Sequence, residues 1–158
     1  MRRAMRLWTL ACACGLSLLA APFSVLAQPS PPDEVVHKLV KLALENMPRA
    51  LCADLKPCPP ATPEEFKSPP VSMEHARAII ASGTRTALAD WCGLDWRRRS
   101  YLPMMHHYRR TLRFNERQMS LVGLLHGIHQ GMTEGALKTK GTCDEATRAK
   151  LDAQLPKT

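Results

Sequence analysis

Two histidines and a methionine, spaced three residues apart, could carry metal chemistry in this sequence. His126, His129 and Met132 follow one another at this interval, and residues three apart lie on neighbouring parts of one helix face. Imidazole and thioether groups together suit copper. On such a helix, however, Met132 would point into the core with Leu125 and Ile128, and His126 would lie toward the polar side. A copper site at His126 and His129 is therefore one interpretation, and an ordinary helix without a metal is the other.

A series of basic side chains could support a second chemistry, the recognition of anions. On a helix starting near Leu102, the spacings 0, 3, 4, 7 and 11 place five residues on one face: His106, Arg109, Arg110, Arg113 and Arg117. Met104, Tyr108 and Leu112 fall on the opposite face, which is expected to be buried. Guanidinium groups suit planar recognition of carboxylate or phosphate. The arginine face is thus either a solvated cluster or a surface that binds an acidic protein or an anionic envelope component.

The positive charge of the chain is concentrated in the same segment. The sequence has 22 Lys and Arg against 14 Asp and Glu, and residues 97–117 hold seven Arg and one acid, Glu116. Elsewhere the charges of the expected mature chain nearly cancel. This asymmetry predicts an acidic or anionic partner; no nucleic acid partner and no cofactor are expected.

The cysteines predict disulfides. Cys12 and Cys14 would leave with an export signal, and an even set remains: Cys52, Cys58, Cys92 and Cys143. Four cysteines in an oxidising compartment indicate two disulfides, and the absence of a C-x2-C pair argues against a zinc site. We expect Cys52–Cys58 to close a tight loop after the first helix. We expect Cys92–Cys143 to tie the end of the second helix to the start of the last.

The N-terminus has the organisation of an export signal. Three arginines within the first six residues precede an apolar run from Leu7 to Leu19, and small residues lead up to a cleavage position after Ala27. The run is shorter than the roughly 20 residues that a membrane span needs, so a cleaved signal is favoured over an anchor. The sequence thus predicts a signal over 1–27 and a single helical domain over 28–158. The mature protein would be periplasmic or secreted, with no transmembrane span.

Apolar spacing and capping residues predict an all-α bundle of about five helices. The helices are expected from Ser30 to before Pro48, from after Ser72 to before Gly93, from about Leu102 to Phe114, from Asn115 to Leu137, and from Thr142 to Leu155. Thr62 and Glu65 form a capping box for one short turn, and Pro103 is expected to interrupt any helix before Leu102. No strand-length run alternates apolar and polar residues.

A ladder of glycines follows one flank of the expected fourth helix. Glycine recurs every fourth residue at Gly123, Gly127, Gly131 and Gly135. Each glycine destabilises a helix interior by about 1 kcal/mol relative to alanine, so the ladder predicts the close approach of another helix. The expected contacts are the small residues of the second helix, Ala76, Gly83 and Ala87.

The motifs favour a binding protein over an enzyme. The sequence has no G-x-S-x-G, H-E-x-x-H or G-x-G-x-x-G motif, and paired cysteines would leave no thiol nucleophile. The first functional hypothesis is therefore a binding module that uses the arginine face, and copper handling is the second. Small exported helical proteins with disulfides also include stress chaperones and toxin-immunity inhibitors, which is a likeness of architecture alone.

Overall fold

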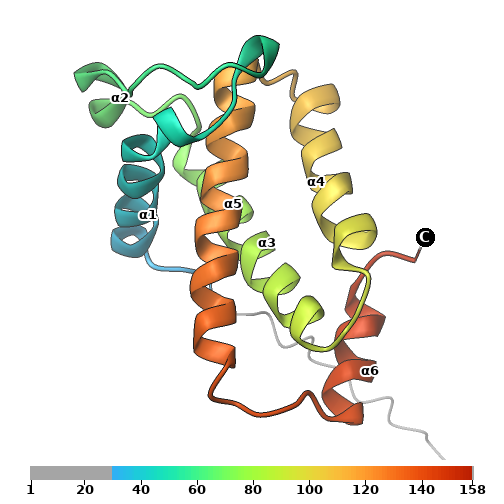
Figure 1. The fold of residues 1–158 in the computed structure, drawn as a ribbon. Coiled ribbons are helices and arrows are strands. Elements are labelled where there is room, and N and C mark those ends of the chain that lie inside the picture. Colours follow the sequence, from blue (N-terminus) through green and yellow to red (C-terminus); the bar gives the residue numbers. More distant parts are fainter. Residues whose placement is uncertain (1–29, 158) are drawn as a thin grey trace, which may run out of the picture.

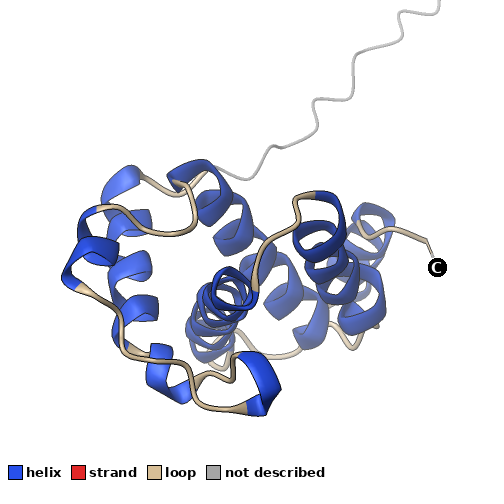
Figure 2. Cartoon of the chain, turned by 90° about the horizontal axis from the view of Figure 1, so that it is seen from above, coloured by secondary structure: helices blue, strands red, loops and turns tan. Residues whose placement is uncertain are grey.

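The computed structural model describes residues 30–157, and the predicted export signal lies outside them. Within this range the regular structure is helical (Figure 2), apart from one isolated β-bridge between Leu51 and Pro57. The predicted all-α fold is therefore confirmed. In chain order the elements are α1 (Asp33–Glu45), η1 (Met47–Arg49), η2 (Ala53–Leu55), α2 (Pro63–Lys67), α3 (Met73–Trp91), η3 (Arg97–Tyr101), α4 (Leu102–His106), η4 (His107–Thr111), α5 (Glu116–Leu137) and α6 (Glu145–Gln154).

Helices α3 and α5 form the centre of the fold, where they cross (Figure 1). Helix α1 packs against both, and α6 packs against the end of α3. The three central helices share their apolar stripes, whose members are at most 5% exposed: Val36, Leu39, Val40, Ala76, Ile79, Ile80, Leu121, Val122 and Leu125. Burying each of the larger side chains stabilises the fold by about 1.5 to 3 kcal/mol, so this cluster holds the three helices together.

Local sequence signals set most helix ends as expected. The Ser72 hydroxyl accepts a hydrogen bond from the His75 amide at 3.3 Å, which starts α3. The capping boxes of α2 and α5 also form. Gly93 follows α3 with φ of +66°, a conformation that favours glycine.

Two helix starts differ from the prediction. Helix α1 begins at Asp33 after Pro32, without a side-chain cap, so Ser30 does not start it. Helix α6 is capped by Asp144, whose carboxylate accepts from the Thr147 amide at 2.7 Å. A carboxylate directly before the first helical residue reaches the free amides of the first turn, so Thr142 is not the cap.

The prediction that Pro103 interrupts the third helix was wrong. The chain is helical from η3 through α4 to η4, and Pro103 lies inside this run. The Leu102 amide donates to the Arg97 carbonyl, an i→i+5 bond of a π turn. This wider turn accommodates a proline that has no amide hydrogen. We refer to residues 96–111 as the arginine helix; it ends before Arg113, which has φ of +56°.

Both predicted disulfides are confirmed. Cys52–Cys58 closes the turn around η2, and Cys92–Cys143 joins the end of α3 to the residues that lead into α6. Within residues 30–157, no helix combines the length and the apolar character that crossing a membrane would need.

Candidate binding groove along α5

A groove runs along α5 on the side that faces the arginine helix. It consists of two adjoining pockets of about 560 and 440 Å³. Both pockets are lined by Tyr101, Gly123 and Gly127, so they form one continuous depression. The larger pocket reaches Leu51 beside the Cys52–Cys58 disulfide, and the smaller one reaches Gln130.

One wall of the groove comes from a single row of the arginine helix. Arg97, Tyr101, Met105 and Arg109 all line it, and they recur every fourth residue. Side chains four apart on a helix stand above one another, so the row has an apolar middle and a guanidinium at each end. The Arg109 guanidinium forms an ion pair with Glu116 at the start of α5.

The opposite wall is α5 itself, and glycines form much of its surface. A Cβ atom added at Gly123, Gly127, Gly131 or Gly135 would have no neighbour within 4 Å. The prediction that the ladder contacts another helix was therefore wrong. Met119, Leu124 and Ile128 supply the apolar side chains of this wall. Gly123 and Gly127 therefore leave the α5 backbone open in the groove, and Gly131 and Gly135 are not part of its lining.

The close helix contact that the ladder was expected to make lies on α3 instead. A Cβ atom at Gly83 would stand 2.8 Å from the His126 carbonyl oxygen and 3.2 Å from the Gln130 amide nitrogen. Atoms at such distances would overlap, so Gly83 allows the backbones of α3 and α5 to touch. This contact sets where the two central helices cross.

The same crossing buries His126, which was expected on the polar side of the helix. The side chain is 1% exposed, and its Nε2 lies 3.0 Å from the Thr86 hydroxyl. Burial, and then the charge of Arg85 and the nearby His129, lower the pKa of His126 to about 4. The imidazole is therefore neutral at physiological pH.

The three residues of the copper interpretation, His126, His129 and Met132, have different surroundings in the structure. The Nε2 of His129 lies 2.9 Å from the Thr84 hydroxyl, and its Nδ1 is buried without a partner among residues 30–157. Burial lowers the pKa of His129 as well. Met132 is 58% exposed rather than in the core. No group of three potential metal-binding side chains (His, Cys, Asp or Glu) occurs in the described part of the chain. Each histidine forms a hydrogen bond with a threonine of α3.

The five basic residues expected on one helix face are divided among different environments. His106 and Arg110 are exposed on the arginine helix, and Arg109 pairs with Glu116. Arg113 lies after the helix has ended, in the left-handed conformation that breaks the predicted face. Met104, Tyr108 and Leu112 do pack against the core, as expected for the other side of the helix.

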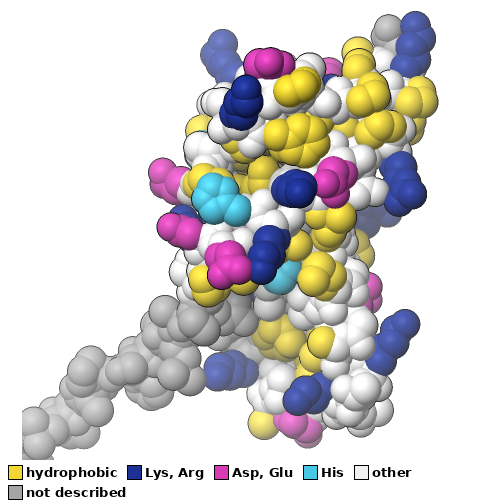
Figure 3. Space-filling model, turned by 90° about the vertical axis from the view of Figure 1, so that its left-hand side faces the viewer, with side chains coloured by type: hydrophobic (Ala, Val, Ile, Leu, Met, Phe, Trp, Pro, Cys, Tyr) yellow, Lys and Arg dark blue, Asp and Glu magenta, His cyan; other side chains and the backbone are white. Residues whose placement is uncertain are grey.

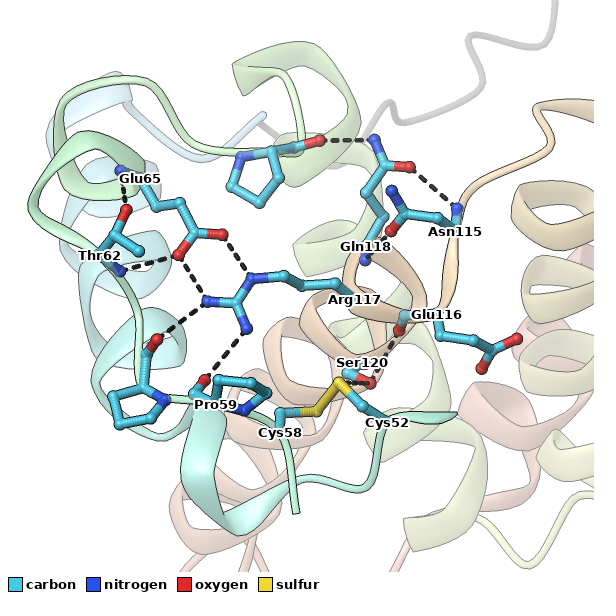
Figure 4. A network of polar contacts seen from close by, with 12 residues as sticks. Cys52, Cys58, Pro59, Thr62, Glu65, Asn115, Glu116, Arg117, Gln118 and Ser120 are labelled. Carbon is cyan, nitrogen blue, oxygen red and sulfur yellow. Dashed lines mark hydrogen bonds and ion pairs between the residues drawn. A yellow bond between two sulfur atoms is a disulfide. The ribbon is translucent and has the colours of Figure 1, made fainter. Parts of the chain in front are cut away.

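Arg117 forms hydrogen bonds with the proline-rich loop and with Glu65 of α2 (Figure 4). Its Nε and Nη2 donate to the two carboxylate oxygens of Glu65, each at 2.5 Å. Its guanidinium also donates to the carbonyls of Pro59 and Pro60, at 3.0 and 3.2 Å. The hydrogen bond from Arg117 holds the pKa of Glu65 below its usual value. Arg117 therefore fastens the proline-rich loop to α5, and it lies on α5 rather than on the arginine helix.

One other face of the molecule carries charges of both signs. On the face next to α1, basic and acidic side chains alternate with apolar ones (Figure 3). In and just after the arginine helix, four arginines that lie close together in sequence form no ion pair with the residues that the structure describes: Arg97, Arg98, Arg110 and Arg113. Of the arginines in this segment, Arg97 and Arg109 line the groove itself.

Sequence reasoning missed the groove although a signal for one wall was present. The row from Arg97 to Arg109 has four-residue spacing, but a helix begun at Leu102 excludes its first two members. The open glycine flank could not be distinguished from a packed one, because both require small residues. Comparison of the chain with known protein families, curated proteins and solved structures found no match.

Proposed function

We propose that the mature chain is an exported binding module whose groove takes up an acidic, amphipathic helix of a partner protein. The observation that carries the proposal is the open glycine flank of α5 opposite the row of Arg97, Tyr101, Met105 and Arg109. An apolar channel between two helices is the usual receptor for the apolar face of a third helix. The two disulfides suit a periplasmic or secreted location.

The dimensions of the groove support a helical occupant. Arg97 and Arg109 are twelve residues apart, which corresponds to about 18 Å, or roughly three turns of helix. Gly123 and Gly127 present backbone in the middle of this length, where a partner helix could approach more closely than bulky side chains would permit. One amphipathic helix of about three turns matches this length.

The charges of the groove support an acidic occupant. A guanidinium stands at each end of the apolar row, and the Arg109–Glu116 pair is about half exposed on both sides. An exposed ion pair contributes little stability, so a partner carboxylate can compete for Arg109. The neighbouring arginines raise the local positive potential, which accelerates association with an acidic segment.

The test uses a helix-stapled acidic peptide of about 16 residues, with Leu and Tyr on one face and Glu on the other. Titrated into the disulfide-bonded mature chain, it should shift the amide resonances of Gly123 and Gly127 and bind more weakly at high salt. Arg97→Glu with Arg109→Glu should reduce the affinity about tenfold or more. The control, Arg148→Glu with Lys150→Glu, makes the same charge change on exposed positions of α6 and should retain binding.

Two results would overturn the proposal. Equal binding of a peptide with Lys in place of Glu would show that charge does not select the partner. Binding to phosphatidylglycerol vesicles, with no binding of the peptide, would assign the arginines to an anionic envelope surface instead.

A further inference from the structure

The smaller pocket of the groove contains a buried hydrogen-bonding group. It is lined by aromatic and polar side chains and by two glycines: Trp96, Arg97, Tyr101, Gly123, His126, Gly127 and Gln130. His126 is 99% buried, and it is the one buried residue of this set. The glycines alone would define only an open stretch of helix.

The hydrogen bonds of Thr86 fix which nitrogen of His126 carries the proton. The Thr86 hydroxyl lies 3.0 Å from the Ser82 carbonyl oxygen and 2.9 Å from that of Gly83. Two carbonyl oxygens so close require the hydroxyl proton to point at them. The Thr86 oxygen therefore accepts from Nε2–H of His126. In this tautomer Nδ1 carries a lone pair and is an acceptor.

Nδ1 of His126 has no hydrogen-bond partner among residues 30–157. In this part of the chain, the Nδ1 of His129 is the one side-chain nitrogen or oxygen that is fully buried and has no partner. The Nδ1 of His126 is therefore not fully enclosed. His126 and Tyr101, whose rings pack together, both line the pocket, so a ligand in the pocket lies next to the imidazole. A buried acceptor that lacks a partner favours a ligand that brings a donor.

The walls around this acceptor favour an aromatic ring. The rings of Tyr101 and His126 are tilted at a centroid distance of 5.0 Å, and Trp96 stands edge-on to Tyr101 at 6.2 Å. Trp96 Nε1 donates to the Asp90 carboxylate at 2.7 Å, which holds the indole in place. Aromatic rings prefer such tilted and edge-on arrangements with one another. The pocket, of about 440 Å³, leaves room for one more ring.

We propose that this pocket binds the anchor side chain of the partner helix, an aromatic ring whose O–H donates to Nδ1 of His126, as tyrosine would. This inference rests on the proposed function for the identity of the occupant, but the pocket can be tested separately. Tyrosine is among the residues that most often anchor protein interfaces. The chemistry of the walls and the acceptor distinguishes it from phenylalanine, which has no donor.

The experiment compares two small probes, p-cresol and toluene, on the disulfide-bonded mature chain. We expect p-cresol to shift the ring nitrogen resonances of His126 and to bind about three- to tenfold more tightly than toluene, the difference that one hydrogen bond makes. Gly127→Leu should abolish this binding by filling the pocket. Gly135→Leu places the same side chain at an open position of α5 outside the pocket and should leave binding unchanged.

The outcomes separate the pocket from the groove. Equal affinity for the two probes, no binding of either, or loss of binding in Gly135→Leu overturns the anchor pocket. If the acidic peptide still shifts Gly123 and Gly127 in that case, the proposed function stands without the anchor. If p-cresol binds as expected and the peptide does not, the pocket stands and the helical partner is wrong.

Discussion

At the scale of single residues, glycines on two sides of the α3–α5 crossing have opposite roles. Gly83 meets the α5 backbone, whereas Gly127 faces open space. We predict that Gly83→Ala lowers the free energy of unfolding by about 1 to 3 kcal/mol, because the added methyl group overpacks the crossing. Gly127→Ala should raise it by up to about 1 kcal/mol through helix propensity. Urea unfolding of both variants measures this, and a loss of stability in Gly127→Ala would contradict the open groove.

His126 makes the stability of the fold depend on pH. Its pKa in the folded protein is about 4, below the value of about 6.5 for an unperturbed histidine. The unfolded chain therefore binds the proton first, so stability is complete above pH 6.5 and falls as the pH drops toward 4. The loss should be about 3 kcal/mol, the equivalent of this difference.

Unfolding measured at pH 7 and pH 4.5 tests this dependence. The lowered pKa of His129 acts in the same direction. Thr86→Val separates the two histidines, because it removes the hydrogen-bond partner of His126 and leaves Thr84, the partner of His129, in place. It should be less stable than the wild type at pH 7. A free energy of unfolding that stays constant between these pH values in the wild type would show that His126 is not protected from protonation.

At the scale of elements, one ion pair connects the proline-rich loop to α5. The side chains of Arg117 and Glu65 are 25% and 18% exposed, and two loop carbonyls share the same guanidinium. We predict that Arg117→Met lowers the free energy of unfolding by about 1 to 2 kcal/mol, less than for a fully buried pair because solvent screens it in part. Arg109→Met breaks the more exposed pair with Glu116 and should lower it by less than about 1 kcal/mol.

Thermal unfolding of the two methionine variants gives the comparison. The lowered pKa of Glu65 adds a second readout. Because a carboxylate with a lowered pKa stabilises the fold above its unfolded pKa, the Arg117 contribution should disappear as the pH falls below about 4.5. An equal effect of both substitutions at pH 7 would mean that Arg117 behaves as an ordinary surface residue.

At the scale of the whole molecule, the sequence predicted what depends on neighbours along the chain. Ser72, Gly93 and the Asn115–Gln118 pair mark helix ends by local hydrogen bonding or backbone preference, and these ends are where they were expected. The disulfides followed from the order of the helices, because each pairing connects ends that the chain brings together.

What could not be predicted depends on which helix faces which. The glycine ladder could have faced a helix or open space, and spacing alone does not distinguish the two. His126 appeared polar on an isolated helix, but Gly83 lets α3 come close enough to bury it beside Thr86. The continuous helix through Pro103 depended on a π turn that has no sequence pattern of its own. Each error therefore concerned an element whose surroundings are set by tertiary packing.

The two disulfides should contribute unequally to the free energy of unfolding. Cys52–Cys58 spans six residues of sequence and Cys92–Cys143 spans 51. Loop-closure entropy then predicts a loss of about 2 kcal/mol for replacing the first pair with alanine and about 4 kcal/mol for the second. The second pair also positions α6, whose Asp152 and following carbonyls bind Arg99 of the arginine helix.

The structural consequence of losing Cys92–Cys143 should therefore reach the groove. In Cys92→Ala with Cys143→Ala, we expect faster amide hydrogen exchange in α6 and in residues 96–111, because Arg99 loses its fixed partner element. In Cys52→Ala with Cys58→Ala, faster exchange should be confined to the turn around η2. Hydrogen exchange of both double variants, measured together with their urea unfolding, shows how far the effect of each lost disulfide spreads. If residues 96–111 keep their protection without Cys92–Cys143, this wall of the groove is held by its contacts with α3 rather than by α6.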